Sequence, residues 1–113
     1  MGKNIYYNPE SFGLSVVAQI DYSSGYYEFD IRVVWKDKAG KLWTARDHGC
    51  SCPTPFEDYH LGNISPLDLR ELVSECRAEL SGYNSDNVSP QMVQDFLRAV
   101  SLAALAPKPE TTG

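Results

Sequence analysis

Two short turns follow one another in the first half of the chain, and they restrict the fold more than any other feature. One turn is formed by residues 23–25 and the other by residues 37–40, and both end in glycine. Turns of this composition join antiparallel strands. The segments on either side alternate between apolar and polar side chains, as half-buried strands do: residues 14–22, residues 27–36 and the stretch from 41 to 48. The sequence therefore predicts a three-stranded antiparallel β-meander.

The two turns also predict strand registers that agree with each other. A three-residue loop with Gly40 in the left-handed region pairs Trp35 with Trp43 and Val33 with Ala45. Across the first turn, the pairing of Tyr22 with Tyr27 implies three further pairs: Ile20 with Phe29, Ala18 with Ile31, and Val16 with Val33. A slip of one residue would turn all these side chains to the other face. We therefore expect one apolar core face, which carries Ile20, Tyr27, Phe29, Ile31, Val33, Trp35 and Trp43.

The opposite face of the predicted sheet is mostly polar, and we expect it to be open to water or to a partner. It carries Ser15, Val17, Gln19, Asp21, Glu28, Asp30, Arg32, Val34, Lys36, Leu42, Thr44 and Arg46.

Two helices are predicted in the second half of the chain. Ser65 before Pro66, and Ser89 before Pro90, each supply an N-cap followed by a proline in the first helical position. Apolar residues then recur at helical spacing: Leu69, Leu72, Val73, Cys76 and Leu80, then Val93, Phe96, Leu97, Val100 and Ala104. Packed on the apolar face of the meander, these helices give a two-layer α+β fold with the order β-β-β-α-α.

Length and charge limit the classes of protein that fit. The 113 residues predict a single α+β domain over residues 1–106, with an N-terminal arm over residues 1–12 and a flexible tail over residues 107–113. A net charge of -5 disfavours binding to nucleic acid or anionic lipid. No signal peptide or membrane-spanning apolar run is found. We expect a cytoplasmic protein without nucleic-acid or membrane partners, and the oligomeric state stays open.

Cysteine and histidine residues gather after the third predicted strand. They are His48, Cys50, Cys52 and His60, and Cys76 follows on the first helix. Thiolates and imidazoles are the ligands of structural zinc, which takes four of them. Paired zinc cysteines are usually separated by two residues rather than one, and Cys76 falls on an apolar stripe, where free cysteine packs as a small hydrophobe. We predict no cofactor, and a small zinc-binding module using Cys50, Cys52 and a histidine is the alternative.

Two catalytic interpretations apply to the same residues. A redox-active thiol needs positive charge nearby, which Arg46 or His48 could supply. A Cys–His hydrolase needs an oxyanion site and an oriented third residue, and the sequence shows neither. A polar pocket beside His48 and Cys50 would favour such an enzyme. We predict that the protein is not an enzyme.

Acidic residues recur along one side of the first predicted helix: Asp68, Glu71, Glu75 and Glu79. They indicate either a solvated helix face or an acidic surface that docks on a basic partner.

Two surfaces are predicted to bind a protein partner. Loops held by a stiff scaffold commonly carry function, and the loop after the third strand contains two rigid prolines. Phe56 is either an anchor in that loop or a plug for the core beneath it. The predicted binding residues are Cys50, Cys52, Pro53, Pro55, Phe56 and Glu57 in the loop, and Arg32, Val34 and Leu42 on the open sheet face.

The first half of the chain resembles a family of small uncharacterised proteins encoded by bacteriophages of actinobacteria. The resemblance covers residues 8–58 and rests on three motifs: Phe12-Gly13-Leu14, the strand from Tyr27-Glu28-Phe29-Asp30 to Val33-Val34-Trp35, and Gly49-Cys50-Ser51-Cys52-Pro53 with Pro55-Phe56-Glu57-Asp58. It implies a phage origin and no particular activity. Because many small phage proteins act by binding a host protein, it favours a non-enzymatic accessory protein.

Overall fold

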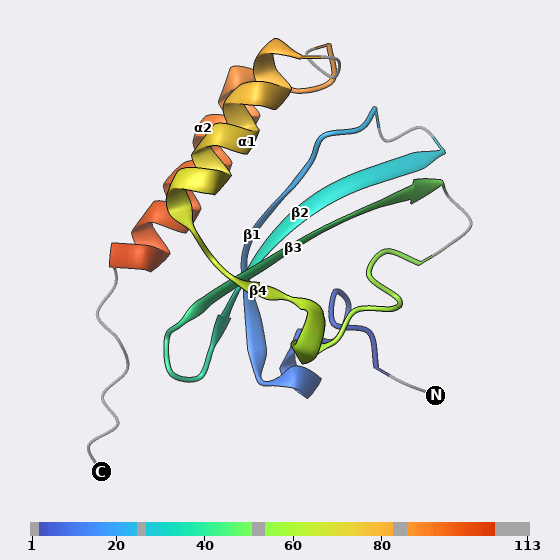
Figure 1. The fold of residues 1–113 in the computed structure, drawn as a ribbon, viewed down its shortest axis with the longest axis vertical. Coiled ribbons are helices and arrows are strands. Elements are labelled where there is room, and N and C mark those ends of the chain that lie inside the picture. Colours follow the sequence, from blue (N-terminus) through green and yellow to red (C-terminus); the bar gives the residue numbers. More distant parts are fainter. Residues whose placement is uncertain (1–2, 25–26, 51–53, 83–85, 106–113) are drawn as a thin grey trace.

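The computed structural model describes residues 3–24, 27–50, 54–82 and 86–105, and the predicted tail lies outside them. Three antiparallel strands, β1 (Leu14–Asp21), β2 (Glu28–Asp37) and β3 (Leu42–Cys50), form the predicted meander. A two-residue strand, β4 (Ser65–Pro66), pairs with β3 and was not predicted. The helices are α1 (Leu69–Ser81) and α2 (Pro90–Leu105), with short 3-10 helices η1 (Pro9–Phe12) and η2 (Leu61–Asn63) (Figure 1). The α+β class is confirmed.

The predicted register of the second hairpin is confirmed. Trp35 lies opposite Trp43 and Val33 lies opposite Ala45. Gly40 has a φ of 86°, a left-handed conformation that glycine adopts without a steric penalty. The Asp37 N–H donates to the Lys41 carbonyl at 2.9 Å, which closes the hairpin at the predicted pair.

The predicted register of the first hairpin is wrong on both sides of a bulge in β1, since Val16 lies opposite Trp35 rather than Val33. Ile20 lies opposite Arg32 rather than Phe29, and the register shifts between Val16 and Ala18. The extra residue turns the rest of the strand over, so that side chains after the bulge face the opposite side of the sheet from those before it. The connection to β2 is also longer than predicted, and Tyr27, expected in the core, is 76% exposed.

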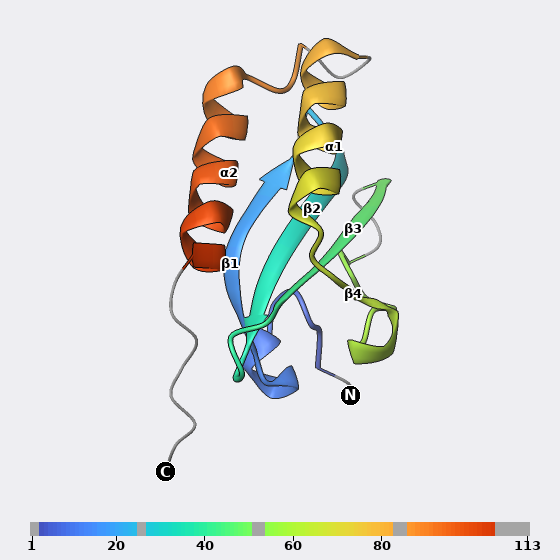
Figure 2. The same ribbon diagram turned by 60° about the vertical axis from the view of Figure 1, so that its left-hand side comes forward.

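Both helices pack on the face of the sheet that was predicted to be open. That face, here called the helix face, carries Arg32, Val34 and Arg46 of β2 and β3. Val34 is fully buried there in one cluster with Leu72, Cys76, Phe96 and Val100 of the helices. Figure 2 shows the two helices side by side on the sheet. The prediction of an open face is therefore wrong, because α1 brings carboxylates that neutralise the two arginines.

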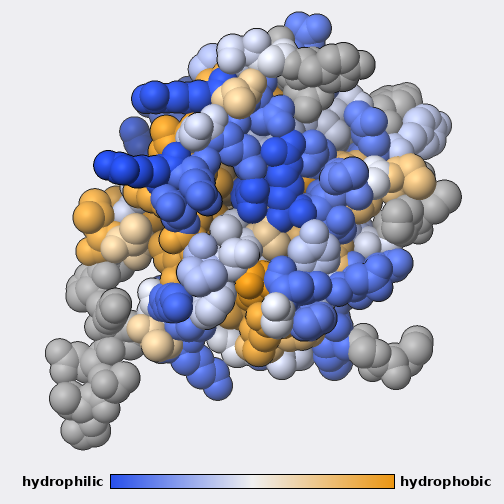
Figure 3. Space-filling model, viewed as in Figure 1, coloured by the Kyte–Doolittle hydropathy of each residue, from blue (hydrophilic) through white to orange (hydrophobic). Residues whose placement is uncertain are grey.

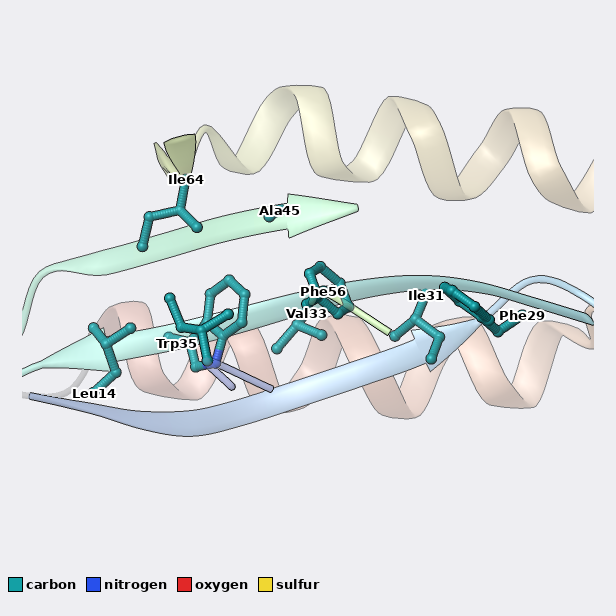
Figure 4. Close-up of a cluster of buried hydrophobic side chains, with 9 residues drawn as sticks. Leu14, Phe29, Ile31, Val33, Trp35, Ala45, Phe56 and Ile64 are labelled. Carbon is teal, nitrogen blue, oxygen red and sulfur yellow. The ribbon is translucent and has the colours of Figure 1, made fainter. Parts of the chain in front are cut away.

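The other face of the sheet, called the Trp35 face, is covered by the N-terminal arm and by the β3–β4 loop (residues 54–64). Trp35 and Phe29 lie there in one buried cluster with Ile5 of the arm and with Phe56 and Ile64 of the loop. Figure 4 shows Phe56 close to Val33 and Trp35 on this face. The leucine-lined helices thus do not meet the tryptophan pair, and irregular segments complete that core instead.

The start of α1 also differs from the prediction. Asp68 caps the helix, and its Oδ1 accepts from the N–H of Arg70 at 3.0 Å and of Glu71 at 3.3 Å. Ser65 and Pro66 are held in β4, since the adjoining Leu67 N–H donates to the Leu42 carbonyl of β3 at 2.9 Å.

The start of α2 agrees with the prediction. The Ser89 hydroxyl accepts from the Met92 N–H at 3.1 Å, and Pro90 is the first helical residue. Within the described residues, neither helix combines the length and hydropathy that crossing a membrane requires.

Candidate functional site

A network of five charged side chains lies where α1 crosses the sheet. Arg46 of β3 forms ion pairs with Asp30 of β2 at 2.8 Å and with Glu79 and Glu75 of α1 at 2.6 Å and 3.3 Å. Arg32 of β2 forms a two-pronged pair with Glu75. The β2–β3 register places the two arginines opposite each other. Because both guanidinium groups are already paired, the network holds α1 against the sheet and offers little free positive charge.

Tyr22 and Glu75, which meet at the centre of this arrangement, have shifted pKa values. Burial raises the pKa of Tyr22, whose hydroxyl donates to Glu75 at 2.8 Å, so the phenol stays protonated. Burial also raises the pKa of Glu75, but the hydrogen bonds from Arg32 and Tyr22 and the charges of Arg32 and Arg46 together lower it by more, so the carboxylate stays charged. The Arg46 guanidinium lies 4.5 Å from the centre of the Tyr22 ring. The paired groups therefore support the contact between α1 and the sheet.

A cleft of about 430 Å³ opens beside this network, between α1 and β3. Its floor is formed by side chains of β2 and β3, and its walls by the start of α1, by β4 and by the β3–β4 loop. Figure 3 shows hydrophilic side chains gathered between α1 and β3. The cleft is lined by Arg32, Thr44, Ala45, Arg46, Tyr59, Asn63, Ser65, Pro66, Leu67, Asp68, Glu71, Leu72 and Glu75.

The cleft is acidic. Its lining holds two arginines and three carboxylates, Asp68, Glu71 and Glu75, which leaves an excess of one negative charge. The arginines are paired within the network, whereas Asp68 and Glu71 lie at the exposed rim, and no described side chain forms an ion pair with either. A cationic group is therefore favoured in the cleft, and a phosphate is disfavoured.

The outer edge of β3 continues past the cleft. β4 pairs with β3 only at Trp43 and Thr44. Within the described part of the chain, no strand lies beside residues 46–50 of β3, which are called the open edge below.

Of the binding residues predicted on the sheet, only Arg32 lines the cleft. Val34 is buried and Leu42 is half-buried under the helices, so neither forms an open surface. The cleft also uses Arg46, which was not proposed as a binding residue, and Asp68, Glu71 and Glu75 of the acidic helix side that was weighed as a docking surface. Their signals were present, since the acidic side of the first helix and the arginines of adjacent strands are visible in the sequence.

The predicted loop residues are dispersed rather than gathered. Phe56 is fully buried, and Pro55 is half-buried, with its carbonyl accepting from Asn4 Nδ2 at 3.0 Å. Glu57 is exposed, and Cys50 is exposed at the end of β3. Cys52 and Pro53 lie outside the described residues. The loop thus acts first as a cover for the Trp35 face.

The metal candidates do not converge within the described residues. No group of three or more His, Cys, Asp and Glu side chains there is arranged to hold a metal ion. His60 uses its Nδ1 to accept from the Gly62 N–H at 3.0 Å, and Cys76 is fully buried, with burial raising the pKa of its thiol. Because Cys52 is not described, the zinc module stays a prediction, and elemental analysis of protein purified without added metal tests it.

A second cavity, of about 390 Å³, lies beside His48 and Cys50 and is partly polar, with Asp30 and Glu28 in its lining. This is the feature that the hydrolase interpretation requires. No hydrogen bond joins His48 to Cys50, although a Cys–His catalytic pair depends on one.

The chain was compared with known proteins and protein families. No curated protein and no solved structure matches the chain. A family model matches residues 3–106, which include both helices and the whole sheet. The chain therefore belongs to the DUF7574 family, which is described as a domain of unknown function.

Proposed function

We propose that this domain is a non-enzymatic accessory protein that binds a protein partner, and that the cleft between α1 and β3 is its docking surface. The observation that supports this most is the acidic cleft of about 430 Å³, whose arginines are already neutralised by Asp30, Glu75 and Glu79. Such a site selects a lysine or arginine side chain and disfavours nucleic acid.

The ion-pair network gives this surface a fixed shape. Asp30, Arg32 and Arg46 come from the sheet, and Glu75 and Glu79 come from α1, so the floor of the cleft is joined to α1 before any partner binds. A preorganised surface loses less conformational entropy on binding and therefore binds more tightly.

The proposed origin and location rest on the resemblance described above. The likeness of residues 8–58 to actinobacteriophage proteins supports a phage-encoded protein whose partner is a host protein in the bacterial cytoplasm. The prediction of a protein partner is kept, but the proposed docking surface is now the cleft rather than the loop and the sheet face.

Site-specific photo-crosslinking tests the proposal. A photoreactive phenylalanine analogue replaces Glu71 at the rim of the cleft, and the matched control carries it at Lys38, which is exposed in the turn between β2 and β3. In a lysate of an actinobacterial host, we expect position 71 and not position 38 to cross-link to one protein. When the domain is used to capture its partner from the lysate, the variant Glu71→Arg should recover about tenfold less of that partner, or less still. Identical products from both positions, or none from position 71, contradict the proposal.

The cavity beside His48 and Cys50 favours a second candidate, a thiol-dependent enzyme. An activated thiol reacts with iodoacetamide well below the ordinary cysteine pKa of about 8.5. The rate at which iodoacetamide modifies Cys50, measured against pH in protein carrying Cys52→Ser, distinguishes the two functions. A rate that rises only near the ordinary cysteine pKa argues against the enzyme.

A further inference from the structure

We infer that the partner docks as an extended, lysine- or arginine-bearing segment that adds a strand to the open edge of β3, residues 46–50. This inference rests on the proposed function, and it specifies which kind of partner segment the cleft receives.

The hydrogen-bond pattern shows which backbone groups of β3 point outward. The Asp37 N–H donates to the Lys41 carbonyl, so odd-numbered residues of β3 bond to β2 and even-numbered residues face away from it. Two outward carbonyls confirm this alternation, since Leu42 accepts from the Leu67 N–H and Arg46 accepts from the Tyr59 hydroxyl at 2.9 Å.

The remaining outward groups of the open edge form a template for another strand. They are the N–H of Arg46 and the N–H and carbonyl groups of His48 and Cys50, and no described residue forms a hydrogen bond with them. A row of such groups binds an extended backbone.

The other exposed edges of the sheet are blunted, unlike this one. β1 carries the bulge between Val16 and Ala18, and β4 is only two residues long and ends in Pro66, which has no N–H. Proline and bulges are absent from residues 46–50 of β3. The open edge is therefore the position on the described sheet that is best suited to pair with a further strand.

Carboxylates lie on both sides of the open edge. On the helix face are the cleft, with Glu71 at its rim, and the second cavity, which contains Glu28. On the Trp35 face is a third cavity of about 210 Å³, lined in part by Asp47, Glu57 and Asp58. Side chains of an added strand alternate between these two faces, so the charge at either face favours a basic residue.

Amide hydrogen exchange measured by NMR on the full chain tests the geometry. The probe is a short peptide of alternating lysine and valine. In the free protein, the outward amides of Arg46, His48 and Cys50 should exchange quickly, whereas the neighbouring odd-numbered amides are protected by β2. Saturation with the probe should slow exchange at these three amides by about tenfold or more. Unchanged rates at these amides overturn the inference.

Two altered peptides separate backbone pairing from charge attraction in the unmodified protein. The same peptide N-methylated at every backbone nitrogen keeps its charges but cannot donate, and it should bind about tenfold more weakly or worse. A glutamate–valine peptide should not bind. Equal binding of the N-methylated peptide overturns the strand geometry.

A matched pair of variants tests the same point from the protein side. His48→Pro removes one outward N–H without removing a bond to β2, and His48→Ala keeps that N–H. We expect probe binding about tenfold weaker for the proline variant and unchanged for the alanine variant. If the proline variant does not fold, the N-methylated peptide decides the question.

The failure of this inference and that of the proposed function give different results. A partner that cross-links to position 71 without slowing the edge amides shows docking in the cleft by another geometry, and overturns only the strand inference. Slowed edge amides without a cross-linked partner support a peptide site at the edge and contradict the proposed function.

Discussion

The replacement Phe56→Ala distinguishes a buried core residue from a surface anchor. The side chain is 0% exposed and its ring packs against three others, with centroids 4.9 Å from Tyr59, 5.4 Å from Tyr6 and 5.8 Å from Trp35. Truncation of a buried phenylalanine costs about 3–5 kcal/mol because transfer energy is lost and a cavity remains. A domain of this size has a free energy of unfolding of about 5–15 kcal/mol, so the loss is a large part of the total.

The backbone at Phe56 makes the experiment sharper. Its φ is 62°, a left-handed conformation that costs a residue with a Cβ atom roughly 1 kcal/mol. At an ordinary position, glycine is less stable than alanine by about 0.5–1 kcal/mol. Here the relief of strain offsets that penalty, so Phe56→Gly should be as stable as Phe56→Ala or more stable.

Urea denaturation followed by tryptophan fluorescence measures these differences, because Trp35 contacts Phe56 directly. We expect a loss of about 4 kcal/mol for Phe56→Ala, which lowers the melting temperature by roughly 10–20 °C. The control Glu57→Ala changes an exposed neighbour and should stay within about 0.5 kcal/mol. A loss below about 1 kcal/mol for Phe56→Ala, or a glycine variant clearly less stable than the alanine variant, refutes this account of the loop.

Three further predictions concern α1 and the network. Arg46→Ala leaves the carboxylates around it without their shared cation. It should lower the free energy of unfolding, measured by urea denaturation, by about 2 kcal/mol, a value between those for exposed and buried ion pairs. The control Arg70→Ala, on the exposed side of α1, should change it by less than about 0.5 kcal/mol. Asp68→Ala removes the observed N-cap and should cost about 1 kcal/mol, whereas Ser65→Ala, at the position expected from the sequence to be the cap, should have almost no effect. Because the pKa of Glu75 is lowered in the folded state, its contribution to stability is full above the ordinary carboxyl pKa and is lost as the pH falls through the lowered value. With Glu75→Gln, the free energy of unfolding should therefore fall less steeply as the pH is lowered through the acid range.

The comparison of the two hairpins shows where prediction from sequence succeeds. The register at Trp35 and Trp43 was predictable because a short loop closed by Gly40 permits few geometries. The register at Ile20 was not, because the connection between β1 and β2 is longer than the tight turn expected at residues 23–25. The bulge after Val16 has no distinct residue signature either, and its one extra residue places later side chains on the opposite face.

The candidate site shows the opposite case. Arginines and glutamates with the required spacing are present in the sequence, yet their pairing depends on which face of the sheet α1 covers. The helix face was expected to be open because most of its side chains are polar. In the folded chain Glu75 and Glu79 neutralise them, and the same residues become the support of a cleft.

The sequence by itself determined the local structure of this protein: the meander, the second register, the cap and first turn of α2, and the existence of two amphipathic helices. Turn chemistry and side-chain periodicity act over a few residues, so neighbouring residues are sufficient to specify them. Only the tertiary structure decided which face each helix covers, that Phe56 and Ile5 close the other face, and that β3 keeps an open edge. Those outcomes depend on contacts between segments that are distant in the chain, such as the ion pair of Arg46 with Glu79. Such contacts contribute to stability only when the chain has folded and the two segments lie together.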